Sequence, residues 1–172
     1  MKQYLLIGIL CFAIACKNDD SKGPVTPLPD APKSMSYSII TSYPHDTSSY
    51  TQGLLIYKGE MYEGTGNYTF SKLKKVDIKT GKALQQISLP DEYFGEGITI
   101  LNDTIYQLTW KEKKVFVYTL KDFKKVKEFD ANIEGWGLTN DGKNLIVSTG
   151  GSDLNFYDPS TFKLLKTQII TK

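Results

Sequence analysis

A glycine followed by an apolar residue recurs at three places in the sequence, Gln52-Gly53-Leu54, Glu96-Gly97-Ile98 and Trp136-Gly137-Leu138. The three glycines are 44 and 40 residues apart, so the sequence has a period near 42 residues. Self-similarity at a fixed interval indicates a chain that is built from structural repeats. Each further motif is therefore interpreted by its place within the repeat.

Each repeat contains four short stretches with the pattern of β-strands. The first two flank a tight turn and predict a hairpin, and the turns are Lys58-Gly59, Asn102-Asp103 and Asp141-Gly142. The third stretches are residues 73–78, 115–120 and 154–157. The fourth stretch alternates apolar and charged residues, as in residues 124–129, which predicts an outer strand with one face in solvent. No stretch after residue 20 has a convincing helical period.

Four antiparallel strands in a repeat of this length are typical of a β-propeller blade. An all-β sandwich is the alternative, although it would not require equivalent turns at equal intervals. Residues 50–172 hold three repeats, whereas propellers usually close with about four to eight blades. We expect a fragment of a longer chain, with assembly of several copies or an open-edged remnant as alternatives. Residues 36–43 are a candidate strand of a further blade.

The N-terminal residues predict export and lipid attachment. Residues 1–15 have one lysine followed by an apolar run that is too short to span a bilayer, as in a signal peptide. The run ends in Ala13-Ile14-Ala15-Cys16, which resembles a bacterial lipobox, so Cys16 is expected to carry lipid. Cleavage of an ordinary signal near Ala15 is the alternative. Residues 16–35 predict a flexible tether and residues 36–172 the folded domain, anchored in a bacterial cell envelope on its periplasmic or outer-membrane face.

The composition excludes two classes of partner. The chain has 172 residues and a net charge of +2, and all 21 of its basic residues are lysines. Without arginine it cannot make the bidentate guanidinium contacts that read bases and phosphates, so we expect no nucleic acid partner. One histidine and two cysteines are too few for a zinc site, and we expect neither metal nor cofactor. His45 and the lysine-rich residues 72–75 and 121–127 are expected to be solvated.

The starts of the first strands lie near the central axis of a propeller, and they hold the candidate site residues. These residues are Tyr50, Gln52, Phe94, Glu96, Glu134 and Trp136. A carboxylate among aromatic rings loses hydration, which raises its pKa and suits Glu96 to acid–base chemistry. The alternative for Glu96 is a bulge residue that satisfies buried backbone donors. Trp110 and Trp136 have core packing as their alternative, and Gln52 a buried amide.

Six motifs at compatible spacing across residues 36–172 resemble the plant-type and bacterial glutaminyl-peptide cyclotransferases, which are five-bladed β-propellers. The motifs are Tyr50-Thr51-Gln52-Gly53-Leu54, Tyr62-Glu63-Gly64-Thr65-Gly66, Phe94-Gly95-Glu96-Gly97-Ile98, Gln107-Leu108-Thr109-Trp110-Lys111, Glu134-Gly135-Trp136-Gly137-Leu138 and Asp158-Pro159-Ser160-Thr161-Phe162. The resemblance implies a metal-independent enzyme that converts the N-terminal glutamine of peptides or proteins to pyroglutamate and releases ammonia.

The resemblance also implies roles for single residues. Glu96 would be the general acid/base, and the matching substrate-binding residues are Tyr50, Gln52, Phe94, Trp110 and Trp136. Tyr50 stands where the family more often has phenylalanine. The family domain continues past the equivalent of Lys172 with a Trp-Ala-Asn strand and a later lysine, so the activity of this chain alone is an open question. The alternative function is a non-enzymatic, lipid-anchored binding propeller; a quinoprotein-like propeller is disfavoured because its ligand residues are lacking.

Overall fold

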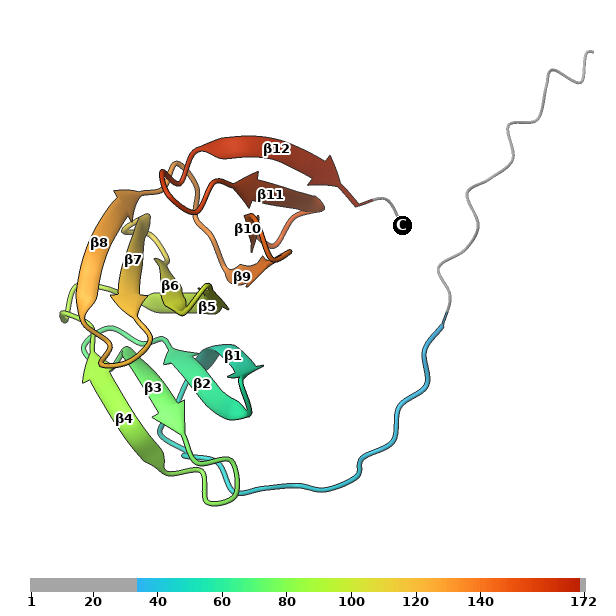
Figure 1. Cartoon of the computed structure of the whole chain (residues 1–172), viewed down its shortest axis with the longest axis vertical. Coiled ribbons are helices and arrows are strands. Elements are labelled where there is room, and N and C mark those ends of the chain that lie inside the picture. Colours follow the sequence, from blue (N-terminus) through green and yellow to red (C-terminus); the bar gives the residue numbers. More distant parts are fainter. Residues whose placement is uncertain (1–33, 171–172) are drawn as a thin grey trace, which may run out of the picture. The chain divides into compact units, whose positions relative to one another are not determined.

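The computed structural model describes residues 34–170, and it divides the chain into Met1–Met35 and Ser36–Lys172. The expected signal peptide, Cys16 and nearly all of the expected tether lie outside the described residues. Within the described residues, no helix has the length and apolar character needed to cross a membrane. All regular structure in residues 34–170 is β-strand (Figure 1).

Twelve strands form three antiparallel sheets of four strands each, and each sheet keeps its strands in chain order. The first sheet contains β1 (Thr51–Tyr57), β2 (Glu60–Thr65), β3 (Lys72–Val76) and β4 (Ala83–Ser88). The second sheet contains β5 (Gly95–Leu101), β6 (Thr104–Thr109), β7 (Lys114–Thr119) and β8 (Lys125–Asp130). The third sheet contains β9 (Gly137–Asn140), β10 (Leu145–Ser148), β11 (Asp153–Tyr157) and β12 (Leu164–Ile169).

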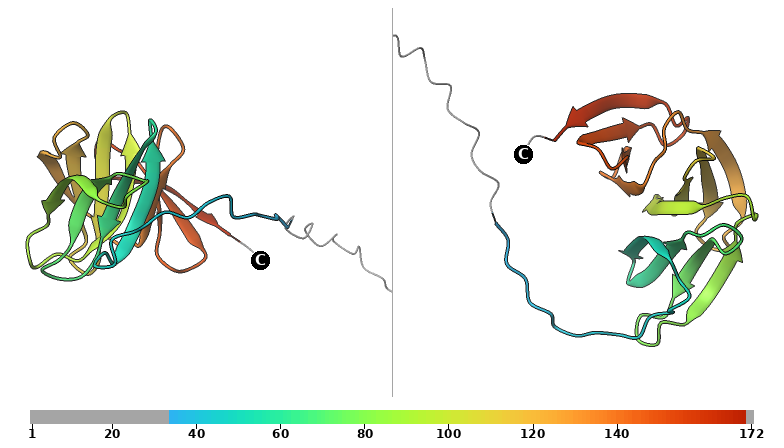
Figure 2. Two further views of the ribbon diagram at one scale, coloured as in Figure 1. Left: turned by 90° about the horizontal axis from the view of Figure 1, so that it is seen from below. Right: turned by 180° about the vertical axis from the view of Figure 1, so that it is seen from behind.

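The arrangement confirms the predicted all-β fold with three propeller blades. In each sheet the first strand lies on the inside and the fourth on the outside, and the three sheets succeed one another around a common centre (Figures 1 and 2). Residues 36–43, a candidate strand, form no strand in the described structure and are exposed.

Local turn chemistry explains where the strands begin and end. Lys58 and Gly59 have positive φ values of 51° and 80°, which suit the two-residue turn of a β-hairpin. Asn102 and Asp103, in the equivalent turn of the second sheet, also have positive φ values, of 51° and 56°. The third strand of the first sheet was expected to reach residue 78 but ends at Val76. There the Asp77 carboxylate accepts hydrogen bonds from the backbone nitrogens of the next residues and turns the chain.

Two apolar cores join the sheets. The core between the first and second sheets contains Tyr62, Leu73, Leu89, Ile98, Ile100, Ile105, Phe116, Tyr118 and Phe123. The core between the second and third sheets contains Leu101, Tyr106, Leu108, Val115, Val117, Ala131, Leu145, Val147, Tyr157 and Phe162. The second sheet therefore has both faces covered, and every residue of β5 is buried.

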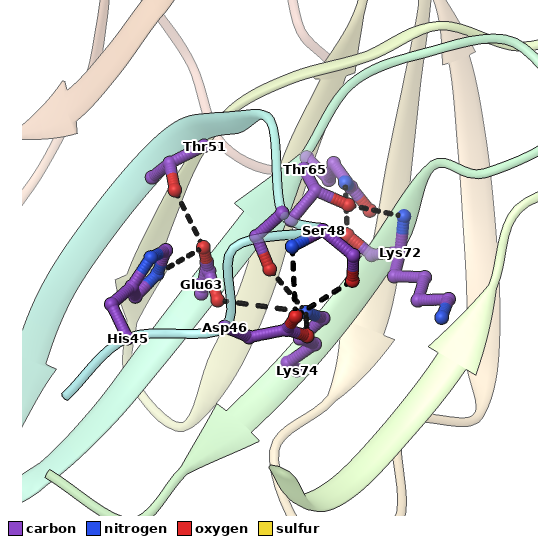
Figure 3. A network of polar contacts seen from close by, with 10 residues as sticks. His45, Asp46, Ser48, Thr51, Glu63, Thr65, Lys72 and Lys74 are labelled. Carbon is purple, nitrogen blue, oxygen red and sulfur yellow. Dashed lines mark hydrogen bonds and ion pairs between the residues drawn. The ribbon is translucent and has the colours of Figure 1, made fainter. Parts of the chain in front are cut away.

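One expectation about charged side chains is wrong. Lys74, within the stretch expected to form a solvated face, is only 3% exposed, because β3 is an interior strand and residues N-terminal to β1 cover it. His45 is exposed, as expected, although its Nε2 also lies 2.9 Å from the buried Glu63 carboxylate (Figure 3). The lysines of residues 121–127 are exposed, as expected.

Two of the repeated glycines, Gly53 and Gly97, lie where the inner strands of neighbouring sheets approach closely. Gly97 donates a backbone hydrogen bond of 2.9 Å to the carbonyl oxygen of Trp136. A Cβ atom at Gly97 would lie 2.6 Å from that oxygen and 2.6 Å from the nitrogen of Leu138. A Cβ atom at Gly53 would similarly lie 2.5 Å from the nitrogen of Ile98. Only glycine permits this contact between inner strands without moving the backbone.

Replacing Gly97 by alanine should therefore separate β5 from the start of the third sheet. We expect Gly97→Ala to lower the free energy of unfolding by about 1–3 kcal/mol, because the added methyl group meets backbone atoms that cannot turn aside. Gly151→Ala is the matched control, since a Cβ atom there would meet no atom closer than 3.9 Å. Urea unfolding should show a change of about 0.5 kcal/mol or less for the control; equal stability of both variants would refute the close-contact explanation.

Candidate active site

The starts of the inner strands enclose a pocket of about 270 Å³. Its lining residues are Tyr50, Gln52, Phe94, Glu96, Trp110 and Trp136. These are the six residues that the sequence analysis assigned to catalysis and substrate binding, and their roles remain predictions. Glu134, which occupies a related strand start, is exposed and does not line the pocket.

Two β-bulges aim side chains of the inner strands into this pocket. On β1 the pairing passes from Thr51–Thr65 to Gly53–Gly64, so Gln52 is an extra residue. On β5 the pairing with β6 likewise shifts between Gly95 and Ile98, around Glu96. Bulges are frequent beside functional sites because they redirect side chains. The bulge that the alternative interpretation of Glu96 required is thus present.

The Glu96 carboxyl is buried, with only 6% of the residue exposed. Within residues 34–170 its side chain has no hydrogen-bond partner, which disfavours a role in satisfying backbone donors. Burial, together with a smaller contribution from the nearby charge of Glu112, raises its pKa from 4.5 to about 7. A carboxyl with this pKa can both accept and release a proton near neutral pH.

Aromatic rings form the walls of the pocket. Phe94 packs edge-to-face with Tyr50 and Trp110, at centroid distances of 6.2 and 5.5 Å. The indole of Trp136 lies against Gly150, where a Cβ atom would be 2.4 Å from the ring. Trp136 is 49% exposed, so it is a wall of the pocket rather than a core residue. Trp110 is partly buried, and Gln52 is also partly rather than fully buried.

Two residues that the sequence analysis did not single out support this wall. The Glu112 carboxylate accepts a hydrogen bond of 2.9 Å from the Tyr68 hydroxyl and one of 3.3 Å from the Phe94 nitrogen. Tyr68 in turn packs against the Phe94 ring at 5.5 Å. Glu112 falls two residues after Trp110, so the motif around Trp110 carried a signal for it, whereas Tyr68 lies in a loop without any periodic pattern.

The pocket suits proton transfer on a small polar ligand. The carboxyl of Glu96 and the amide of Gln52 are polar groups among four aromatic side chains, which can confine a flexible ligand. Among residues 34–170, no group of three or more His, Cys, Asp or Glu side chains is arranged to hold a metal ion. The chemistry that the described residues themselves offer is acid–base chemistry.

Comparisons with known proteins agree with these features. The family model for glutamine cyclotransferases matches residues 7–172. A curated glutaminyl-peptide cyclotransferase from Arabidopsis thaliana is 40% identical over 135 residues, which are 77% of this chain and 42% of that protein. The crystal structure of a glutaminyl cyclase from Myxococcus xanthus superposes with a TM-score of 0.72 at 29% identity, covering 78% of this chain and 56% of that one.

A more distant similarity concerns the fold alone. The WD40 domain of Pan2 from Neurospora crassa superposes with a TM-score of 0.57 at 15% identity, over 69% of this chain and 36% of that one. The chain spans about half the length of the two cyclotransferase relatives. Because the family model covers nearly the whole sequence, and a curated member shares 40% identity with most of it, the chain belongs to the glutamine cyclotransferase family.

Proposed function

We propose that the protein to which this chain belongs converts the N-terminal glutamine of peptides or proteins to pyroglutamate and releases ammonia. The observation that carries the proposal is a buried Glu96 carboxyl, with a pKa of about 7, in an aromatic pocket of a glutamine cyclotransferase. The names of the plant and bacterial relatives support the same reaction. We propose it for the whole protein, since this chain spans about half the length of those relatives.

Glu96 would act first as a base and then as an acid. Its carboxylate takes a proton from the α-ammonium group of the substrate, and the neutral amine attacks the carbon of the side-chain amide. The new carbon–nitrogen bond closes a five-membered ring. The bond from that carbon to the amide nitrogen then breaks as Glu96 returns its proton to the departing nitrogen, and ammonia leaves. The ring nitrogen gives up its second hydrogen as a proton, which the ammonia takes up to become ammonium.

The walls of the pocket would further accelerate the reaction by holding the amine of the substrate close to its side-chain amide. Attack within one substrate molecule needs the glutamine side chain to fold back on its own amine. Tyr50, Phe94, Trp110 and Trp136 would hold that folded shape and keep water away, and the Gln52 amide offers hydrogen bonds to the polar end. No covalent intermediate with the protein is required.

We further propose that the protein is anchored by lipid at Cys16 in a bacterial cell envelope, on the periplasmic or outer-membrane face. Support comes from the apolar run of residues 4–14 and from the resemblance of residues 13–16 to a lipobox. An anchored domain on a tether would meet peptides outside the cytoplasm.

Lipid attachment predicts that Cys16→Ser moves the protein out of the membrane fraction of the expressing bacterium. Cys11→Ser is the matched control, since Cys11 would be removed with residues 1–15 and its loss should change nothing. Fractionation followed by mass spectrometry of the N-terminal peptide measures both. A Cys16→Ser protein that stays in the membrane fraction would argue against this anchor.

The proposed reaction predicts ammonia release from the peptide Gln-Ala and none from Asn-Ala, unaffected by a metal chelator. Glu96→Gln should lower the rate by about 100-fold or more, because general acid–base catalysis is worth at least that much. Glu134→Gln is the control, as Glu134 occupies a related strand start outside the pocket. Binding of Gln-Ala without ammonia would favour a binding module, and a fully active Glu96→Gln variant would remove Glu96 from its role.

The raised pKa of Glu96 predicts a pH-dependent stability difference between the wild type and Glu96→Gln. The folded state holds the proton of Glu96 up to about pH 7, whereas its ordinary pKa is 4.5, so the wild type loses stability as pH rises through this window. Glu96→Gln should therefore gain up to about 3 kcal/mol relative to the wild type between pH 4 and 8. Urea unfolding of the wild type and of Glu96→Gln at pH 4 and pH 8 measures this difference in stability. Glu112→Gln should make the change of this difference with pH smaller, because it removes a charge that helps to raise the pKa of Glu96. A stability difference that does not vary with pH would contradict the raised pKa.

A further inference from the structure

A buried ion pair lies on the face of the first sheet that points away from the second sheet. Glu63 on β2 is 1% exposed and Lys74 on β3 is 3% exposed, with 3.8 Å between Oε2 and Nζ. Their neighbours Tyr62 and Leu73 pack into the core on the opposite face. Buried charges are costly unless they are paired and hydrogen-bonded, so the partners of this pair indicate what it holds together.

The partners come from residues 45–51, the segment that leads into β1 (Figure 3). Glu63 Oε1 accepts a hydrogen bond of 2.6 Å from the Thr51 hydroxyl and lies 2.9 Å from His45 Nε2. Lys74 Nζ donates to Asp46 Oδ2 at 3.0 Å and to the Ser49 hydroxyl at 2.5 Å. The two charged residues thus hold the segment at four points.

Hydrogen bonds within residues 45–51 hold Asp46 and Ser49, the partners of Lys74, in place. Asp46 Oδ1 accepts hydrogen bonds from the nitrogen and the hydroxyl of Ser48, and the Asp46 carbonyl accepts one from the Ser49 nitrogen. The Ser48 hydroxyl and the Lys74 ammonium hold the pKa of Asp46 well below its ordinary value, so its carboxylate stays charged. Pro44 packs against Gly81, where a Cβ atom would lie 2.5 Å from the Pro44 carbonyl oxygen.

The same segment ends in the pocket. Tyr50 and Gln52 line the pocket, and Thr51 between them is tied to Glu63. Tyr50 also accepts a hydrogen bond of 2.8 Å from the Gly66 nitrogen and packs against Phe94. Gln52 is the extra residue of the β1 bulge, a conformation that regular strand pairing does not enforce. The regular β1–β2 pairing therefore does not by itself enforce the position of Gln52, and the contacts of the preceding segment can contribute to it.

We propose that Glu63 and Lys74 are positioning residues for the substrate pocket, which hold residues 45–51 so that Tyr50 and Gln52 stand at its wall. The proposal rests on the proposed function for the identity of the ligand, but the geometry it describes is independent of catalysis. Neither Glu63 nor Lys74 lines the pocket, and both act through the segment.

The test compares Lys74→Met with Lys75→Met in the full chain. Lys75 is the matched control because it pairs with Glu60 at 2.6 Å between the same two strands, away from residues 45–51. Thr51→Val is a milder variant that removes one hydroxyl and leaves Glu63 with its other contacts, in case Lys74→Met fails to fold. Circular dichroism establishes that each variant retains its β-sheets.

Two measurements are independent of activity. Hydrogen exchange of the peptide spanning residues 45–52 should become at least about tenfold faster in Lys74→Met and faster in Thr51→Val, with no change in Lys75→Met. Acrylamide should quench tryptophan fluorescence more strongly in the first two variants, since both tryptophans of the chain line the pocket beside Phe94, against which Tyr50 packs. Unchanged exchange, or faster exchange with unchanged quenching, would overturn the positioning role.

Steady-state kinetics separate positioning from general stability. For N-terminal glutamine peptides, Lys74→Met should raise KM about tenfold while kcat changes less than KM, and Lys74→Arg should recover most of the loss. A fall in kcat alone, or an equal effect of Lys75→Met, would contradict the proposal. If the wild-type chain releases no ammonia, the failure concerns the proposed function, and the exchange and quenching results still decide the positioning role.

Discussion

The contact between the inner strands at Gly97 is the constraint on which the rest of the structure depends. The Gly97 nitrogen donates to the carbonyl oxygen of Trp136, and no side chain fits between the two backbones. This contact places Glu96 and Trp136, which are 40 residues apart in sequence, in the same pocket. The equivalent approach of Gly53 to Ile98 brings Gln52 to it as well. Close backbone packing between blades therefore assembles a site from three separate repeats.

Two buried carboxylates show how burial serves different purposes in one small domain. Glu63 is surrounded by the Thr51 hydroxyl, the His45 imidazole and the Lys74 ammonium, so its charge is used to hold the chain in place. Glu96 has no such partner among the described residues, and its desolvation appears as a raised pKa. The first carboxylate is suited to structure, whereas the second is suited to moving a proton.

Much of the fold was predictable because it follows from local pattern. The 42-residue period, the turns at Lys58-Gly59 and Asn102-Asp103 and the alternation of outer strands are signals within a few residues, and the structure has three sheets at those positions. Five of the six pocket residues were also found from the strand starts, because these converge in a propeller, whereas Trp110 came from the family resemblance and the strand-start residue Glu134 lies outside the pocket. Lys74 was misjudged because its burial depends on residues 45–49, which lie 25 to 29 positions earlier and have no periodic pattern. The contact of Tyr68 with Glu112 escaped notice for the same reason: it joins segments 44 positions apart.

The central claim is that the pocket between the inner strands receives an N-terminal glutamine, and the indole N–H signals of the chain's two tryptophans test it most directly. Both tryptophans line the pocket, so a ¹H–¹⁵N spectrum contains two indole signals that report on it. We predict that Gln-Ala, added to the Glu96→Gln variant to prevent turnover, shifts both signals with one saturation curve, and that N-acetylated Gln-Ala shifts neither. Signals from the folded chain that do not respond to Gln-Ala, or that respond equally to the acetylated peptide, would contradict the claim.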